Sequence, residues 1–477
     1  MKYYIYPNGG NAKYLANAIS ILDGGGGEIS FIDDSLKTHS LEVVIPKIRN
    51  ELSNGEAKIL LSSQKYMHQC LQKLQEKGIQ VAYNGIKYLG ERLNLMLKEK
   101  YKGQKICGIF CDTGGNPLHK YLGNIREILN NNGIKLIYFL YYESEYYKEF
   151  LEYHTKNNDE IVMANYEFLS QFDFVPFVIT HYNVLHFHPN VVTLRIHSSF
   201  DEVSNYVWLV DLYQDRGIER ADTIANYLST YLNIHSQTHY RYFEKNQQIG
   251  GVDPNPIPRF LKGGYPSIDR ETKESQGIDF SMKRDTVIFI SALINFYYED
   301  YYSDILEVVL KEGYRVVFKS NPSHISFKER EDSFALKFKH YSNFIYQCND
   351  EPQLSLENKN RSITIVGACS SLMYSYPALT KRPAILLYPE KNTIPKDLLD
   401  EDCFYNPKLH IRLFKEEAKE GIIKYLKKLS KDLEYQKQWQ KQIEDYCKND
   451  LYNFGDASRY IANFILEWYQ ARSILKE

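Results

Sequence analysis

Short apolar runs alternate with amphipathic stretches along almost the whole chain. Runs such as 2–7 (KYYIYP), 57–63 (AKILLSS) and 362–368 (SITIVGA) have the length and composition of buried strands. Stretches such as 12–22 and 301–313 carry apolar residues at helical spacing. This alternation predicts repeated strand–helix units, parallel sheets and therefore the α/β class.

The pattern predicts four parts. Residues 1–103 are expected to form an accessory Rossmann-like domain and residues 104–247 a first lobe, which closes with a helix from about 218. Residues 248–262 are polar and rich in glycine and proline, which is typical of a linker. Residues 263–477 are expected to form a second lobe with a helical tail.

Two Rossmann-like lobes joined by one linker, with a helical tail able to cross back, make the GT-B arrangement. The predicted fold is therefore a GT-B-like pair of lobes preceded by an additional Rossmann-like domain. In open α/β sheets, ligands bind beyond the carboxyl ends of the strands. We therefore look for chemistry at strand ends.

Composition narrows the function. Hydrophobic residues make up 43% and charged residues 25% of the 477 residues, as in a globular protein, and the formal net charge of −2 predicts no nucleic-acid partner. No apolar run approaches the length of about 18 residues that spans a bilayer, and the first residues lack a signal-peptide core. The seven cysteines are scattered without a C-x-x-C pair, so we expect a reducing compartment and no metal site. The predicted location is the cytoplasm, with peripheral membrane contact through the mixed-charge segment 415–442 as an option.

The accessory domain contains one turn of interest. Asn8-Gly9-Gly10-Asn11 separates a strand from a helix, a place where a helix N-terminus can receive a phosphate. Asp33-Asp34 ends the next strand, where a ribose-binding acid would stand. The glycines are too few for a dinucleotide fingerprint. We therefore favour an accessory domain that binds no nucleotide.

In the first lobe, the leading candidate is His197. It follows the apolar run VVTLRI and precedes a capping-box pattern, Ser199 to Glu202, which places it in a turn between strand and helix. A histidine there can stay neutral and accept a proton from an acceptor hydroxyl near physiological pH; the alternative is a histidine satisfied by local hydrogen bonds. We also predict acceptor contacts from Ser198 and Asn116, and assign the histidines of HYNVLHFHP (181–189) to structural or substrate-lining roles.

In the second lobe, the strongest candidate is the serine pair after SITIVGA. Ser370 and Ser371 open a helix, and the hydroxyls and free N–H groups there suit a diphosphate. A single serine that merely caps the helix is the alternative, and it is compatible with anion binding. The other predicted donor-binding residues also follow strands or the linker: Lys319, Asn321, Glu390, Gly264 and Asp269.

The order of these segments resembles the CDP-glycerol glycerophosphotransferase family, GT-B-like enzymes of teichoic-acid and capsule synthesis. That family has a His-Gly turn, a G-Y-P-R-x-D turn, a K-x-H-P motif, an S-D-Y-S-S motif and a D-G-x-A-S tail. The resemblance covers about 104–477. The corresponding segments here are His197-Ser198, GYPSID (264–269), KSNP (319–322), GACSS (367–371) and FGDAS (454–458).

The resemblance implies a transferase with a first-lobe histidine as base and a donor whose phosphates lie on the second lobe. Three positions depart from the family: Ser267 replaces its arginine, Asn321 its K-x-H-P histidine, and Ala368 its aspartate. The expected donor is CDP- or CMP-linked, and a nucleotide sugar on the same scaffold remains open. The expected acceptor is a hydroxyl of a glycan or a lipid-linked glycoconjugate. The alternatives are a nucleotide-sugar glycosyltransferase of another donor class and a sugar-nucleotide epimerase, which would recruit Asp269 or Glu390. We expect no cofactor and no metal.

Overall fold

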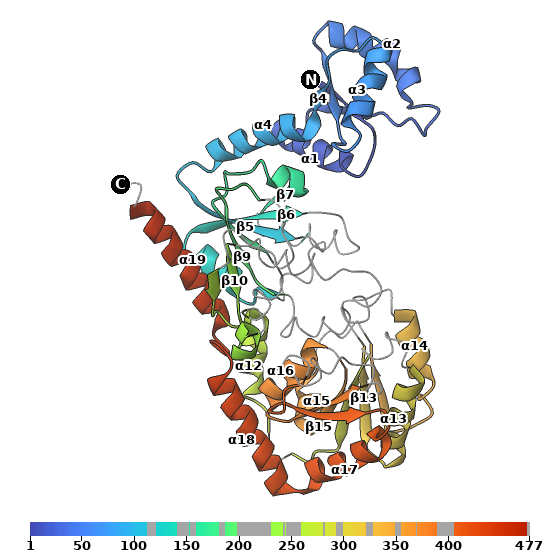
Figure 1. The fold of residues 1–477 in the computed structure, drawn as a ribbon, viewed down its shortest axis with the longest axis vertical. Helices are drawn as coiled ribbons and strands as arrows, with labels where there is room; N and C mark the ends of the chain where they lie inside the picture. The colour runs from blue at the N-terminus through green and yellow to red at the C-terminus, as the bar shows by residue number, and fades with distance from the viewer. Residues whose placement is uncertain are drawn as a thin grey trace.

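The computed structural model of the chain describes residues 1–111, 121–140, 152, 159–180, 187–197, 230–241, 244, 259–279, 282–291, 299–320, 328–348, 354–368, 370–388 and 405–474. In these ranges the named strands form three sheets, and all their pairings are parallel. The sheets follow one another along the long axis of the molecule, and α18 and α19 run along one side (Figure 1).

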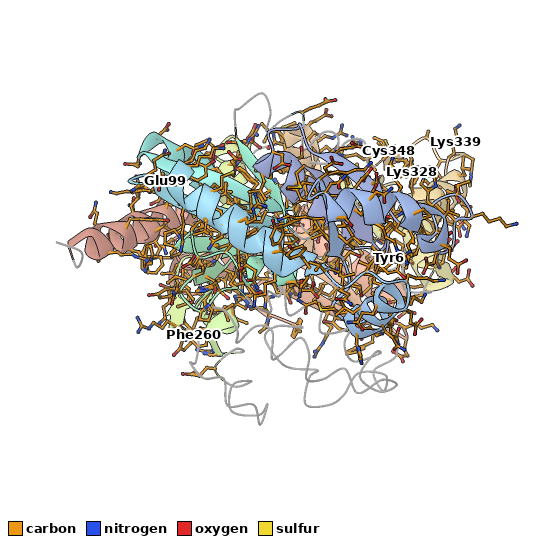
Figure 2. The ribbon with its side chains drawn as sticks, turned by 90° about the horizontal axis from the view of Figure 1, so that it is seen from above. Tyr6, Glu99, Phe260, Lys328, Lys339 and Cys348 are labelled. Atoms are coloured by element: carbon orange, nitrogen blue, oxygen red, sulfur yellow. The ribbon has the colours of Figure 1, made fainter. Side chains whose placement is uncertain are left out.

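The first sheet has the strand order β2-β1-β3-β4. Helices α1 and α4 share an apolar core with the second sheet, whereas α2 and α3 cover a separate cluster around Tyr6 and Ile59. In the view from above, Glu99 of α4 and Tyr6 of β1 lie on different sides of the molecule (Figure 2). The elements are β1 (Lys2–Tyr6), α1 (Ala12–Leu22), β2 (Glu28–Phe31), α2 (Leu41–Ser53), β3 (Ala57–Leu61), α3 (Met67–Glu76), β4 (Tyr83–Asn84) and α4 (Gly85–Lys100).

The second sheet has seven strands in the order β11-β10-β9-β8-β5-β6-β7. Its central strands are continuous apolar runs buried on both faces, as expected for a parallel sheet between helices. The elements are β5 (Lys105–Cys111), α6 (Ile125–Asn131), β6 (Ile134–Leu140), β7 (Glu160–Met163), α8 (Tyr166–Leu169), β8 (Phe177–Thr180), β9 (Val192–Arg195), β10 (Tyr231–Asn233) and β11 (Arg259–Leu261).

The third sheet has six strands in the order β14-β13-β12-β15-β16-β17. Counted in chain order this is 3-2-1-4-5-6, the order of dinucleotide-binding Rossmann folds. The elements are η3 (Pro266–Ile268), α12 (Asp269–Ser275), β12 (Thr286–Ile290), α13 (Glu299–Lys311), β13 (Arg315–Lys319), α14 (Lys328–Leu336), β14 (Phe344–Gln347), α15 (Leu356–Arg361), β15 (Ser362–Gly367), α16 (Ser371–Thr380), β16 (Ala384–Tyr388) and β17 (His410–Phe414).

The tail consists of α17 (Ala418–Lys431), α18 (Leu433–Asn449) and α19 (Ala457–Ile474). Helix α17 packs on the third sheet, and α19 returns to the second. There the hydroxyl of Tyr469 donates to the carbonyl of Ile106, and the Trp468 ring lies 5.2 Å from Phe177. Two Rossmann-like lobes with a tail that crosses back form the predicted GT-B arrangement, and the predicted fold class is confirmed.

Three-residue strands were the hardest elements to predict. Residues 231–233, which the pattern puts at the end of a helix, form β10, and residues 259–261 of the predicted linker form β11. Segments this short carry no readable periodicity. Residues 231–233 form a strand because they pair with β9, and residues 259–261 form a strand because they pair with β10. The expected boundaries of the four parts stay predictions.

Among the helices of the described ranges, none combines the length and the apolarity needed to cross a bilayer.

Candidate functional site

The third sheet has its topological switch point between β12 and β15. Strand order reverses there, because the chain moves outward through β13 and β14 and then returns to the other side of β12. In open α/β sheets, ligands bind at this crevice, beyond the carboxyl ends of the strands. Ser291 follows β12, and Ser370 opens the helix after β15. The predicted serine pair therefore lies at the position that the topology favours for a ligand.

The N-terminus of α16 is built by Ser370. Its hydroxyl oxygen accepts from the backbone N–H of Leu372 at 3.3 Å, so it is the N-cap residue, and Ser371 begins the helix. Both serines are half-buried. A Cβ on Gly367 would lie 2.2 Å from Cγ1 of Ile290, so a glycine is needed where β15 meets β12. The cap and the anion-binding interpretation use the same geometry.

Lys319 stands on the same edge of the sheet, at the end of β13. Its side chain is buried, and its Nζ donates to the carbonyl of Ser320 at 2.8 Å. The hydroxyl of Ser320 in turn donates to the buried carboxylate of Glu331 at 2.6 Å. Strand β12 separates Lys319 from β15, so the cation and the serine pair face the same end of the sheet, two strands apart.

Four predicted residues lie outside the described ranges: Asn116, Ser198, Asn321 and Glu390. Their roles stay predictions.

Gly264 and Asp269, which we predict to bind the donor, contact the tail, and their donor roles stay predictions. Gly264 has φ of 86°, and a Cβ there would lie 2.2 Å from the carbonyl oxygen of Tyr452. The carboxylate of Asp269 is 3% exposed and accepts from the backbone N–H groups of Ala457, at 3.2 Å, and Ser458, at 2.6 Å. Burial raises the pKa of Asp269, although these hydrogen bonds act in the opposite direction. Asp269 therefore caps α19, which the sequence did not suggest.

The first lobe also contacts the start of α19 and the GYPSID segment. The hydroxyl of Ser458 accepts from the backbone N–H of Asn124 at 3.1 Å. A Cβ on Gly123 would lie 2.4 Å from the carbonyl oxygen of Pro266. The GYPSID and FGDAS segments, far apart in sequence, thus form one joint with the turn before α6.

His197 belongs to a cluster of three buried histidines. It follows β9, and His235 and His239 follow β10; their exposed fractions are 0%, 2% and 3%. The His197 ring centroid lies 4.5 Å from that of His239 and 5.3 Å from that of His235. The tail holds this turn in place, because the carbonyl of His235 accepts from the backbone N–H of Tyr452 at 2.9 Å. His197 is fully buried in this structure, whereas the predicted proton acceptor has to be reached by an acceptor hydroxyl.

His235 and His239 were not among the predicted site residues. Their spacing of four residues, with Ser236 between them, was the available signal, because it puts both rings on one face of a helical turn. Ser236 caps this turn by accepting from the backbone N–H of His239 at 3.0 Å.

The spacing of the three rings meets the requirement of a metal site, with one ring nitrogen from each within 4.8 Å of the others. The hydrogen bond of the His239 ring, however, does not match that of a metal ligand. The Nδ1 of His239 accepts from the backbone N–H of His235 at 3.3 Å, so its Nε2 carries the proton in the neutral ring. A ligating histidine instead donates its second N–H. Burial, followed by His235 and His197, holds the pKa of His239 well below its ordinary value. These observations favour a neutral His239 ring that is not a metal ligand.

The corresponding turn of the first sheet is occupied by internal contacts. The switch point between β1 and β3 is bridged by the Ser62 hydroxyl, which donates to the carbonyl of Pro7 at 2.5 Å. Asp33 accepts from Ser35, and Asp34 accepts from the backbone N–H of Leu41. The two acids therefore have structural partners, and the expectation of an accessory domain that binds no nucleotide stays a prediction.

No protein-family model matches the chain, and no curated protein matches it. Similar solved structures include a UDP-N-acetylglucosamine 2-epimerase (12% identity, TM-score 0.48, 77% of this chain and 96% of that one). Another is MnaA of S. aureus with UDP (13%, 0.48, 77% and 97%). A third is MurG of Acinetobacter baumannii (8%, 0.41, 76% and 99%).

Proposed function

We propose that the protein is a transferase that moves a polyol-phosphate or glycosyl group from a nucleotide-activated donor to a hydroxyl of a surface glycan, capsule or glycoconjugate. The observation that carries this proposal is the serine-capped start of α16 at the switch point of the third sheet. Backbone N–H groups, the positive end of the helix dipole and the Ser371 hydroxyl together suit a diphosphate.

The donor side is proposed to work by charge stabilisation. As the bond to the transferred group breaks, negative charge builds on the leaving phosphate. Donors already oriented at the start of α16 would stabilise that charge without reorganisation. Lys319 adds a cation on the same edge of the sheet. Whether phosphorus or an anomeric carbon is attacked depends on the donor.

The acceptor side is proposed to use His197 as the proton acceptor. His197 follows β9 and lies beside His239, whose ring is neutral, and a general base needs an uncharged imidazole. Because His197 is buried, the acceptor hydroxyl reaches it only when the lobes or their loops move upon binding, as in many enzymes that close on substrate.

A CDP-glycerol-like donor rests on the family-like segments alone. Position 321 carries asparagine where that family has the histidine that contacts the donor phosphates. The MnaA structure contains UDP, and a heptosyltransferase of E. coli, WaaC, similar at 14% identity and a TM-score of 0.32, contains ADP. The identity of the donor's nucleobase is therefore the first property to determine.

The epimerase alternative is weaker in one respect. It needs carboxylates for proton transfer, and both oxygens of Asp269 are engaged by the start of α19.

The test is a thermal-shift screen against CDP-glycerol, CMP, CDP, UDP and UDP-sugars. At 100 times its dissociation constant, a ligand stabilises the folded state by about 2.7 kcal/mol. We expect one nucleotide class to stabilise the wild type and the Ser355→Ala control, which loses the cap of α15 in the same lobe. The double variant Ser370→Ala/Ser371→Ala is expected to lose that shift. An equal shift in all three proteins would contradict the donor site.

His197 has a separate test. We expect His197→Gln to keep the nucleotide-dependent thermal shift and to lose transfer to the acceptor by at least about 100-fold, the size of a general-base contribution. Full turnover in this variant would remove the assignment. Turnover of donor to an epimer without any acceptor would favour the epimerase instead.

A further inference from the structure

A cavity of about 300 Å³ lies between the edge strand β17 and the tail helices α17 and α18. Four of its wall residues are aromatic: Tyr405, Tyr425, Tyr435 and Trp439. The other wall residues that the structure describes are Pro407, His410, Ile411, Arg412, Gln438 and Gln442. The proposed function makes no use of this cavity.

The cavity is distinct from the donor site. Its strand residues are the first ones of β17, His410 to Arg412, and the loop that precedes them. The serine pair, in contrast, lies beyond the carboxyl end of β15. Because β16 and β17 are parallel, all strand beginnings lie at one end of the sheet and all strand ends lie at the other. A ligand here would sit away from the switch point.

The walls are held by internal hydrogen bonds. The Nδ1 of His410 accepts from the backbone N–H of Asn406 at 3.1 Å, and its Nε2 therefore donates to the carbonyl of Met373 at 3.2 Å. Burial lowers the pKa of His410 to about 3, so this ring is neutral. The side-chain amide of Gln442 donates to the carbonyl of Pro407 at 2.9 Å. Such fixed walls are typical of a preformed ligand pocket.

Positive charge gathers on the rings of the cavity. The guanidinium of Arg412 lies 4.2 Å from the ring centroid of Tyr405. The ammonium of Lys428 lies 5.4 Å from the Tyr435 ring, and the wall residues that the structure describes include no aspartate or glutamate. The described part of the wall therefore offers cations to an anionic ligand.

We propose that this cavity binds a saccharide unit that carries a negative charge, such as a sugar phosphate. Flat aromatic faces suit the C–H face of a sugar ring, the amides of Gln438 and Gln442 suit its hydroxyls, and Arg412 suits its anionic group. If the proposed transferase function holds, the pocket would retain an anionic acceptor or product chain on the donor lobe. That link rests on the proposed function, whereas the binding itself does not.

The lysines and rings of the same helices would also suit an anionic membrane surface. The four aromatic rings line the wall of a cavity, which suits a saccharide better than a flat membrane surface. Membrane binding is therefore an outcome of the test.

The experiment is ¹⁹F NMR of the full chain labelled with 5-fluorotryptophan. Trp439→Phe assigns the resonance of the pocket, and Trp468 of α19, which packs against Phe177 of β8, reports on correct folding. The probes are glucose 6-phosphate, glucose, inorganic phosphate and phosphatidylserine-containing vesicles. We expect glucose 6-phosphate to shift the Trp439 resonance saturably, at a concentration at least fivefold lower than glucose or phosphate, and to leave Trp468 unchanged.

Two charge variants sharpen the result. Arg412→Gln and the exposed Lys428→Gln should each weaken the glucose 6-phosphate effect, by at least fivefold for the first, while Arg270→Gln, a solvent-exposed control on α12, should not. Equal effects of phosphate alone, or a response to vesicles without one to sugars, would overturn the proposal. Arg412→Gln should keep the nucleotide-dependent thermal shift. If no nucleotide stabilises any variant, the transferase proposal fails and the pocket result stands by itself.

Discussion

Two junctions attach additional parts to the first lobe, and they are built in different ways. The N-terminal junction joins α1 and α4 of the first sheet to β7, α8 and the turn that follows α8. The tail junction joins α19 to the GYPSID segment and the turn before α6. The first spreads its contacts over a wide surface, whereas the second concentrates them at a few backbone groups.

The N-terminal junction combines an apolar core with polar contacts at its border. Leu89, Leu93 and Leu97 of α4 belong to the same buried cluster as the second sheet. Asn94 lies between them, and its amide donates to Asp173 at 2.7 Å. Each apolar contact is replaceable, because burial of apolar area depends on size and not on one chemical group.

The tail junction is built from close backbone approach and one buried carboxylate. Gly123 and Gly264 leave no room for a side chain, and Asp269 supplies both acceptors to the start of α19. Few residue types meet these demands. The comparison teaches that a crowded backbone joint leaves a readable sequence motif, whereas a broad apolar interface does not.

The largest expected effect is at Asp269. Asp269→Ala would leave two buried N–H groups without their acceptor, at a cost of about 3 kcal/mol in the free energy of local opening of 457–474. Hydrogen exchange of this helix measures that quantity, and an increase of about 100-fold in rate is expected. The control is Asp456→Ala, an exposed residue of the same helix start that pairs with Arg459. Equal effects of the two variants would show that the buried carboxylate does not secure the tail.

An intermediate effect is expected at Asn94. Its side-chain oxygen accepts from the backbone N–H groups of Asp173, at 3.2 Å, and Phe174, at 3.1 Å. Asn94→Ala should lower the free energy of opening of the N-terminal junction by about 2 kcal/mol, measured by hydrogen exchange of 159–180. Leu95→Ala, at an exposed neighbour, should change it by less than about 0.5 kcal/mol. If Asn94→Ala lowered the free energy of local opening by more than Asp269→Ala does, the contrast between the two junctions would be reversed.

The smallest effect is expected at Lys98, whose ammonium lies 2.6 Å from Asp173. Burial raises the pKa of Asp173, but Lys98 and Asn94 outweigh it, and the net pKa is lowered. The pair therefore stabilises the fold above the ordinary aspartate pKa, and its contribution is lost as the pH falls through the lowered value. Because Lys98 is largely exposed, Lys98→Gln should cost at most about 0.5 kcal/mol at pH 7. Denaturation at pH 7 and pH 3 should show this cost shrinking with acid; a cost that grows would contradict the assignment.

Much of the fold was readable from the sequence, and the candidate site only in part. The SITIVGA strand, its small residues and the Ser370 cap were predicted, because strand ends and caps are local features. Asp269 was assigned to the donor, since a carboxylate in a turn shows nothing of a partner 188 residues away. His235 and His239 were missed, because their closeness to His197 depends on the pairing of β9 with β10.

Apart from β10 and β11, the local sequence pattern predicted many of the strands and helices, their parallel layers, and the serine pair that opens a helix at a strand end. Those outcomes follow from periodicity and capping, which act within about ten residues. The tertiary structure was needed to show which strand ends lie close together, which carboxylate caps a helix, and where aromatic rings line a cavity. Such outcomes depend on contacts between segments that are distant along the chain, and a linear pattern records only the groups that make them.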